Sequence, residues 1–174
     1  MEWFWYFVIY STLGFCLEVA FARITGQKGA RKAALLLPLC PVYGLGAAAV
    51  LLISKWAGNN ILMLFMAGGA VATVVEYAVG VWYERELGVS FWDYDGLPGN
   101  VQGRVCLPFS VVWGVLAVVL VRIVHPVVEG WMVDIPVPVT IAAAVLTAAD
   151  LTVSGIMMKY TGGRDCLRWY KRTA

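Results

Sequence analysis

The chain has few charged residues. Only 14% of its 174 residues are Asp, Glu, Lys or Arg, whereas soluble domains carry about 25%. Apolar and aromatic residues make up 61% of the chain, and the mean hydropathy is +0.77. This composition excludes an ordinary soluble globular domain and predicts a membrane protein surrounded by the lipid bilayer. The net charge of +2 is too small to indicate a nucleic-acid partner.

Motifs of known enzyme chemistry are also lacking. The four cysteines, Cys16, Cys40, Cys106 and Cys166, form no C-x-x-C pair, and we expect reduced thiols. No Walker loop, zinc signature, nucleophile elbow or dinucleotide fingerprint occurs. The sequence therefore predicts no cofactor and identifies no catalytic residue, and a metal remains unknown at this stage.

Long apolar runs are what the chain does have. Each is about 20 to 23 residues long, enough to span a hydrocarbon core of ~30 Å at 1.5 Å per residue. We predict an all-α, polytopic membrane protein that forms a single transmembrane domain over residues 1–174. Its five transmembrane helices are expected at about residues 3–22, 34–54, 61–83, 105–124 and 136–158.

The basic residues predict the orientation of these helices. If the runs alternate in direction, 11 of the 13 Lys and Arg residues fall on one side of the membrane, with only Lys55 and Arg122 on the other. Cytoplasmic loops carry the excess of Lys and Arg, so we expect the N-terminus outside and the C-terminus in the cytoplasm. Only Met1 and Glu2 precede the first run, which favours a signal anchor over a cleaved signal peptide. The expected location is the inner cell membrane, with several passes.

The second and fourth runs resemble each other. Residues 37–47 and 107–117 are identical at five of eleven aligned positions. The first and third runs each carry one glutamate near the expected cytoplasmic end, Glu18 and Glu76. We infer a duplicated helical hairpin plus a fifth helix, with the pseudo-twofold axis along the membrane normal because both copies enter in the same direction.

Three acids lie inside the predicted spans: Glu18, Glu76 and Asp150. Each is placed roughly 5–8 Å below the middle of its span, at 1.5 Å per residue. A mid-span acid costs about 2.5–3.5 kcal/mol on insertion scales, so the three are expected to share an interior or a water-filled cavity that binds protons or a cation. The alternative is a protonated or hydrogen-bonded packing network between helices.

The second run carries prolines at the depth of the acids. Pro38 and Pro41 either kink the second helix or mark where it begins. Cys40 and Tyr43, beside them, are expected to present polar atoms to the cavity.

The connection Glu84–Gly103 is the longest one on the expected cytoplasmic side and is unusually aromatic. We expect it to lie in the membrane interface or to fold back over the mouth of the cavity. Arg104, which follows it, is expected to reach toward the acids or to bind a lipid phosphate; the alternative is a plain basic anchor.

Several ordered motifs resemble one bacterial family. They are Gly14-Phe15-Cys16-Leu17-Glu18, the segment 40–46, Glu76-Tyr77, Phe91-Trp92-Asp93-Tyr94, the segment 100–107 and Ser110-Val111-Val112-Trp113-Gly114. Over roughly residues 4–126 the chain resembles the family described as putative ABC-transporter type IV. The resemblance implies a transport permease. Two places depart from the family pattern: Phe15-Cys16, and the spacing between Asn100 and Arg104.

Three functions compete at this stage. The first is a small transporter or channel-like protein, expected as a homodimer, with a cytoplasm-facing acidic cavity for a small-molecule or ionic substrate that is cationic or proton-coupled. The second is a permease subunit of an ATP-driven system with a partner membrane or ATPase subunit. The third is an intramembrane lipid-modifying enzyme. The predicted binding residues are Glu18, Glu76, Asp150, Tyr43, Tyr77, Cys40, Trp113, Asn100 and Arg104.

Overall fold

The described part of the chain is built of helices. The computed structural model describes residues 1–26, 35–132 and 135–167. Over these residues it contains no strand, and its one β-bridge joins Val101 and Val105. The elements in chain order are α1 (Glu2–Ile24), α2 (Pro41–Ala57), α3 (Ile61–Trp82), η1 (Tyr83–Leu87), α4 (Leu107–Val119), η2 (Leu120–Val124), α5 (His125–Trp131), α6 (Val137–Thr161) and η3 (Arg164–Leu167).

Four stretches of helix within the described residues are long and apolar enough to cross a membrane. They are Glu2–Ile24, Ile61–Leu87, Leu107–Trp131 and Val137–Thr161. The helix α2 has 17 residues, so it is about 26 Å long at 1.5 Å per residue. This is shorter than a hydrocarbon core of ~30 Å.

The second helix begins later than predicted. The sequence pattern predicted a span from residue 34, which lies outside the described residues, whereas α2 begins at Pro41. The reason is local: Pro41 lacks a backbone N–H and fits the first helical position, and a residue before a proline avoids helical backbone angles. Cys40 accordingly has an extended backbone, with φ −118° and ψ 92°. Pro41 therefore marks the start of the helix, and it does not kink its interior.

Two helices continue past their predicted ends through a π-helical turn. The third continues to Leu87 through one π-helical turn, and it stops at Gly88, whose left-handed φ of 65° suits a glycine. The fourth was expected to end at residue 124 but continues through the π-helical turn η2 into α5 and ends at Trp131. Pro126 stands in the first turn of α5, where a missing N–H is tolerated.

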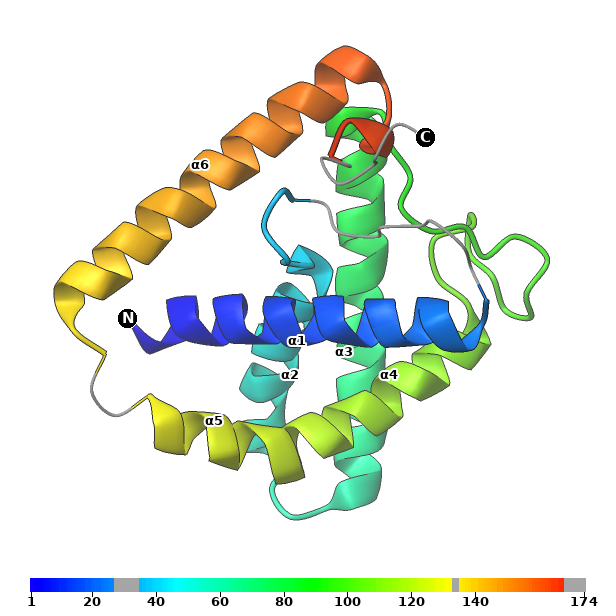
Figure 1. Cartoon of the computed structure of the whole chain (residues 1–174). Coiled ribbons are helices and arrows are strands. Elements are labelled where there is room, and N and C mark those ends of the chain that lie inside the picture. The colour runs from blue at the N-terminus through cyan, green and yellow to red at the C-terminus, as the bar shows by residue number, and fades with distance from the viewer. Residues whose placement is uncertain (27–34, 133–134, 168–174) are drawn as a thin grey trace.

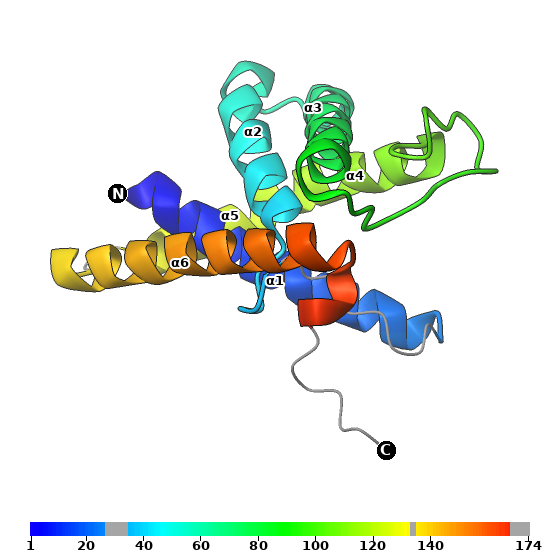
Figure 2. The same cartoon turned by 90° about the horizontal axis from the view of Figure 1, so that it is seen from above.

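The helices pack in chain order: α1 on α2, α2 on α3 and α3 on α4. In Figure 1, α1 runs across α2 and α3, with α6 above it and α4 and α5 below it. Seen from above in Figure 2, α2 and α3 stand side by side, and the connection between α3 and α4 extends away from the bundle. Buried apolar residues gather where α2, α3 and α4 meet, around Val50, Ala72 and Ala117.

Close helix approach depends on small residues. A Cβ at Gly14 would lie 2.2 Å from the Tyr43 ring, and one at Gly44 would lie 2.6 Å from the carbonyl oxygen of Phe7. A Cβ at Gly69 would lie 3.0 Å from the Cα of Gly114. Small residues at such contacts let helix backbones approach closely in membranes, and here they bring the polar side chains of neighbouring helices within reach of each other.

Candidate functional site

Glu76 is a buried acid in the third helix. Only 4% of the surface of Glu76 is exposed. Its carboxylate accepts a hydrogen bond from the Tyr94 hydroxyl at 2.9 Å and another from Trp113 Nε1 at 2.9 Å. Both oxygens of this acid therefore have an aromatic donor, one from the connection before α4 and one from α4 itself.

Glu18 is the corresponding acid of the first helix. It is half-buried, and its Oε1 accepts a hydrogen bond from the Tyr43 hydroxyl at 2.8 Å. The rings of Tyr43 and Trp113 are in contact, with their centroids 5.1 Å apart. The two glutamates are thus joined by a chain of contacts, Glu18 to Tyr43 to Trp113 to Glu76.

The two hairpins make equivalent contacts. Glu18 and Glu76 are 58 positions apart, and their donors Tyr43 and Trp113 occupy aligned positions 70 apart. The same offsets relate a second pair of contacts: Gly44 lies against Phe7, and Gly114 lies against the ring of Phe65. Each hairpin therefore places a glutamate of its first helix against an aromatic donor of its second helix.

Tyr94 belongs to a folded connection, residues 88–106, that we call the α3–α4 lobe. The Tyr94 backbone N–H donates to the Gly103 carbonyl at 2.8 Å, and its ring stacks on Phe109 with centroids 4.6 Å apart. Burial, together with the charge of Glu76, raises the pKa of the Tyr94 phenol. The phenol therefore keeps its proton at neutral pH and remains a donor to Glu76.

Asp150 makes its hydrogen bonds in a different part of the fold from Glu18 and Glu76. It is 8% exposed, and its carboxylate accepts from the backbone N–H groups of Leu36 at 3.0 Å and Leu37 at 2.8 Å. The Ser154 hydroxyl donates to it at 2.8 Å. Asp150 thus ties α6 to the extended segment before α2, and no described contact joins it to Glu18 or Glu76.

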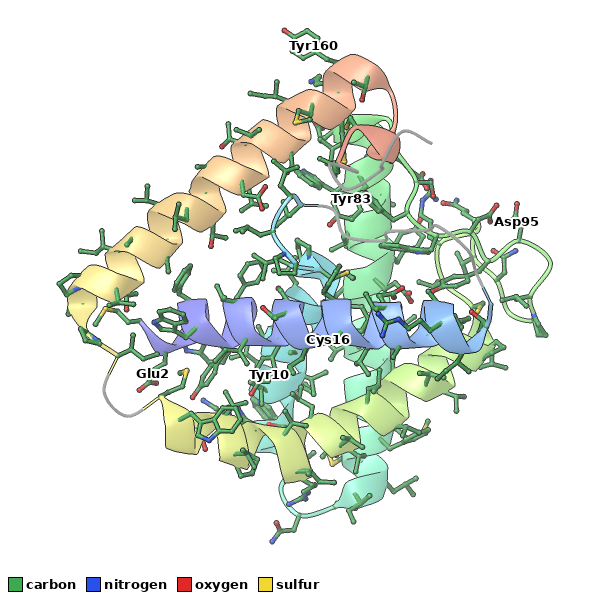
Figure 3. The ribbon with its side chains drawn as sticks, viewed as in Figure 1. Glu2, Tyr10, Cys16, Tyr83, Asp95 and Tyr160 are labelled. Atoms are coloured by element: carbon green, nitrogen blue, oxygen red, sulfur yellow. The ribbon has the colours of Figure 1, made fainter. Side chains whose placement is uncertain are left out.

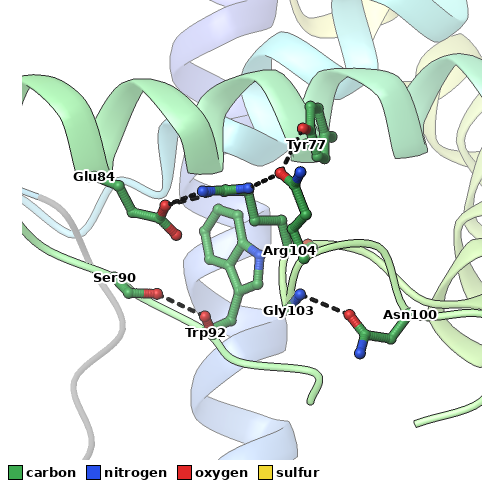
Figure 4. Close-up of polar contacts among 8 residues, drawn as sticks. Tyr77, Glu84, Ser90, Trp92, Asn100, Gly103 and Arg104 are labelled. Atoms are coloured by element: carbon green, nitrogen blue, oxygen red, sulfur yellow. Dashed lines mark hydrogen bonds and ion pairs between the residues drawn. The ribbon is translucent and has the colours of Figure 1, made fainter. Parts of the chain in front are cut away.

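Arg104 is bound at the surface of the third helix. Its guanidinium pairs with the Glu84 carboxylate and donates to the Gln102 side chain, which also accepts from the Tyr77 hydroxyl at 2.9 Å (Figure 4). Its guanidinium carbon lies 5.6 Å from the centroid of the Tyr77 ring. Hydrogen bonding to Glu84 raises the pKa of Arg104. Arg104 and Tyr77 therefore lie outside the glutamate pair and attach the α3–α4 lobe to α3.

Asn100 and Cys40 shape the backbone. Asn100 accepts from the Gly103 N–H at 2.6 Å (Figure 4). It also donates to Asp95 at 3.3 Å, so it holds the turn of the lobe. Cys40 is buried, and its backbone N–H donates to the Ser11 carbonyl at 2.9 Å. Its position before α2 fixes the start of the helix that carries Tyr43.

Two contacts were not predicted from the sequence, one in the site and one outside it. Tyr94 stood in the aromatic motif of the lobe but was not among the predicted binding residues, because a loop position gives no sign of which helix it reaches. His125 is the other: its Nδ1 lies 2.7 Å from the Tyr10 hydroxyl, and its Nε2 lies 3.5 Å from Glu129. Tyr10 lies on the side of α1 that faces α5 (Figure 3). Tyr10 and His125 are 115 residues apart, so no spacing rule links them, whereas Glu129 follows His125 at the i,i+4 spacing of a helix.

An apolar groove of about 450 Å³ lies between α1, α2 and α4. Its lining includes the rings of Tyr43 and Trp113, beside Leu13, Leu17, Gly46 and Leu116. None of the described residues that line it is charged. Two of the three aromatic donors of the glutamates, Tyr43 and Trp113, therefore lie on the wall of an apolar groove. We refer to it as the α1–α4 groove.

No metal centre is evident in the described residues, since no three His, Cys, Asp or Glu side chains there are grouped to hold an ion. Hydrogen bonds from Tyr43, Tyr94 and Trp113 occupy carboxylate oxygens of the two glutamates. What the arrangement offers chemically is two carboxylates that are hydrogen-bonded to aromatic rings, two of which line an apolar groove. Such a set binds cations or exchanges protons.

Comparison with known proteins identifies the family. Searches among curated proteins and among solved structures each gave no match. Residues 5–157 match the family described as putative ABC-transporter type IV. This range covers α1 through most of α6 and contains both glutamates and their aromatic donors. With its apolar helices, the protein is a membrane protein related to transport. The chain belongs to the putative ABC-transporter type IV family.

Proposed function

We propose that the protein is a small membrane transporter whose substrate site is the pair Glu18 and Glu76 with the rings of Tyr43 and Trp113. The supporting observation is the chain of contacts that joins two acids from different hairpins. Acids inside a membrane are costly and are retained for ion or substrate pathways. Carboxylates favour a cationic substrate or a proton over an anion.

The architecture proposed for this function is the duplicated hairpin, with α2 as a fifth crossing and the C-terminus in the cytoplasm. The equivalent contacts of Glu18 with Tyr43 and of Glu76 with Trp113 support the duplication, and the excess of basic residues at alternate connections supports the orientation. In this arrangement the two acids lie toward the cytoplasmic side. Helix α6 stands outside the repeat and is held to it through Asp150.

In the proposed mechanism a bound cation replaces the hydrogen bonds that Tyr43 and Trp113 donate to the glutamates. Tyr43 and Trp113 neutralise part of the charge of the empty site by donating to the glutamates. An arriving cation or proton supplies that charge compensation instead and lets the aromatic donors turn away. Because each acid has its own donor from its own hairpin, occupation of the site changes contacts in both hairpins together.

The full-length protein, reconstituted in liposomes, tests this proposal. Charge movement is recorded after jumps in proton, sodium, potassium and methylammonium concentration, and after jumps in tetraphenylphosphonium concentration with protein-free liposomes as the reference. Glu18→Gln and Glu76→Gln are expected to abolish a current that the wild type gives, while melting temperature stays within a few degrees, because the amide keeps the shape but loses the charge. Glu84→Gln, which alters the acid paired with Arg104 outside the site, is the matched control and should retain the current.

The proposal fails if none of these cations gives a current with the wild type, or if the Gln variants at Glu18 and Glu76 carry the same current. The packing-network alternative predicts that neutral substitutions are harmless or stabilising, because they relieve the desolvation of a buried charge.

A second candidate is a permease subunit of an ATP-driven system, which the family description favours. The α3–α4 lobe is the segment proposed to contact an ATPase, because it extends from the bundle as a folded unit with its own hydrogen bonds (Figure 2). Purification in mild detergent and mass spectrometry test this candidate. An ATPase subunit that copurifies with the wild type, and is lost when Asp93 and Asp95 are replaced by Ala, supports it; recovery of the chain alone contradicts it.

A further inference from the structure

The size and lining of the α1–α4 groove indicate which class of substrate it can bind. It has a volume of about 450 Å³, within the range of about 300–1,000 Å³ that is typical of small-molecule pockets. Its walls come chiefly from α1, α2 and α4 and are aliphatic and aromatic, for example Leu13 and Leu17 of α1 and Leu116 of α4. A ligand that fills it must present a large apolar surface.

The negative charge that acts on the groove comes from carboxylates that accept hydrogen bonds from two of its aromatic rings. Tyr43 and Trp113 line the groove, and their polar hydrogens are directed at the carboxylates of Glu18 and Glu76. A ring that donates to a carboxylate is more electron-rich, and the face of such a ring attracts a cation, more strongly when the cation is desolvated. The two carboxylates add attraction for the same cation. This end of the groove is therefore electrostatically suited to a positive group.

The residues that line the groove do not suit small inorganic cations or phospholipid headgroups. Small inorganic cations such as Na⁺ or Ca²⁺ need several oxygen ligands, and of the described lining residues only Tyr10 and Tyr43 carry a side-chain oxygen. A phospholipid headgroup would call for a basic side chain to meet its phosphate, and none of the described lining residues is basic. What remains is an organic cation whose charge is spread or weakly hydrated.

From this geometry we infer that the α1–α4 groove binds an amphipathic organic cation, with its apolar body along α1 and α4 and its cationic centre against the rings of Tyr43 and Trp113. This inference rests on the proposed transport function and specifies its substrate class. A cation in the groove contacts the aromatic donors of both glutamates, so the same ligand occupies the groove and compensates the charge of the acids through these rings.

A larger side chain at Gly46 is expected to fill the groove. Gly46 lines the groove on α2, and a Cβ built on it meets no atom within 4 Å. Gly46→Leu therefore projects into the groove without a clash at its base, and a leucine favours the helix over a glycine. The matched control is Gly130→Leu in α5, where an added Cβ also meets nothing within 4 Å and which does not line the groove.

The experiment measures equilibrium binding of tetraphenylphosphonium to the purified full-length protein, with neutral triphenylphosphine oxide of similar shape as the comparison ligand. The wild type is expected to bind the phosphonium at least tenfold more tightly than the neutral compound. Gly46→Leu and Glu18→Gln should each weaken phosphonium binding at least tenfold, whereas Gly130→Leu should change it less than twofold. Ala20→Leu, at an exposed position that also lines the groove, fills it from α1 and serves if Gly46→Leu does not express.

Two results would overturn the inference. Equal binding of the charged and neutral compounds assigns the groove to an uncharged apolar occupant such as a lipid chain. Unchanged phosphonium binding in both groove-filling variants places the ligand elsewhere. If phosphonium does not bind but protons or sodium still give a glutamate-dependent current in liposomes, the substrate class is wrong and the proposed transport function stands. If no cation gives a current, the transport function itself fails.

Discussion

Tyr43 on α2 and Trp113 on α4 lie with their ring centroids 5.1 Å apart, and each donates a hydrogen bond to a different intramembrane glutamate. The two aromatic residues occupy aligned positions of the similar segments 37–47 and 107–117. Their contact is therefore the point at which the polar interactions of one hairpin meet those of the other.

Loss of the donor groups should destabilise both hairpins. Tyr43→Phe and Trp113→Phe keep a ring but remove the O–H or N–H that reaches the glutamate. A hydrogen bond to a charged group contributes about 1.5–3 kcal/mol, so both variants should melt at a lower temperature than the wild type in the same detergent. Trp82→Phe, at a tryptophan that is 52% exposed, is the control and should melt like the wild type. Equal melting temperatures for all four proteins would mean that these hydrogen bonds do not stabilise the fold.

The α3–α4 lobe should loosen when Tyr94 loses its hydroxyl. Tyr94→Phe keeps the ring that stacks on Phe109 but removes the hydrogen bond to Glu76. Amide hydrogen exchange, followed by mass spectrometry, should become faster over residues 92–104. Tyr160→Phe, at a tyrosine that is 88% exposed, controls for loss of a hydroxyl. Unchanged exchange in the lobe would show that its own hydrogen bonds hold it in place without Glu76.

Asp150 should act as a structural anchor. Asp150→Ala removes the acceptor for the Leu36 and Leu37 amides and for Ser154, and loss of a partner for buried polar groups costs about 1–3 kcal/mol. We expect a clear fall in melting temperature for Asp150→Ala and a smaller one for Asp150→Asn, whose side-chain carbonyl still accepts. Thr152→Ala, two residues away at an exposed position, should be neutral. A loss of cation current with full thermal stability in Asp150→Asn would instead assign Asp150 to the transport site.

The orientation is tested by thiol labelling. In intact cells a membrane-impermeant reagent should modify a cysteine introduced at Asn59 or Gly130 and should spare one introduced at Gly29 or Gly163. The physical reason is the positive-inside bias of the connections. The labelling is done in a background without the four native cysteines, and permeabilised cells control for reactivity. The reverse pattern would place the glutamates toward the outer face.

Composition and run length were enough to predict an all-helical membrane protein, because the hydrophobic effect acts on whole segments. They were not enough for the helix ends. The start of α2 depends on Pro41 and on the extended backbone of Cys40, and the continuation of the fourth helix into α5 depends on a π-helical turn before Pro126. Both are local backbone effects inside an unbroken apolar run.

The helix face of each acid could be predicted from the sequence, but the partners of each acid could not. Glu18, Glu76 and Asp150 all lie on polar or small-residue stripes of their helices, which is why one cavity was predicted for them. In the structure Asp150 bonds to backbone amides before α2, and Glu76 receives Tyr94 from a lobe 18 residues further along the chain. Such contacts depend on how helices cross and how a loop folds back, which periodicity does not specify.

The central claim is that Glu18 and Glu76 form one site, and a double-mutant cycle on cation current in liposomes tests it most directly. Glu18→Gln, Glu76→Gln and the double variant are compared with the wild type at equal amounts of reconstituted protein. If the two acids act as a unit, each single variant loses at least tenfold in current and the double variant loses no more than the worse single variant, because effects within one site are not additive. Losses that multiply in the double variant, or a single variant that keeps the wild-type current, would show that the two glutamates act separately and would contradict the account.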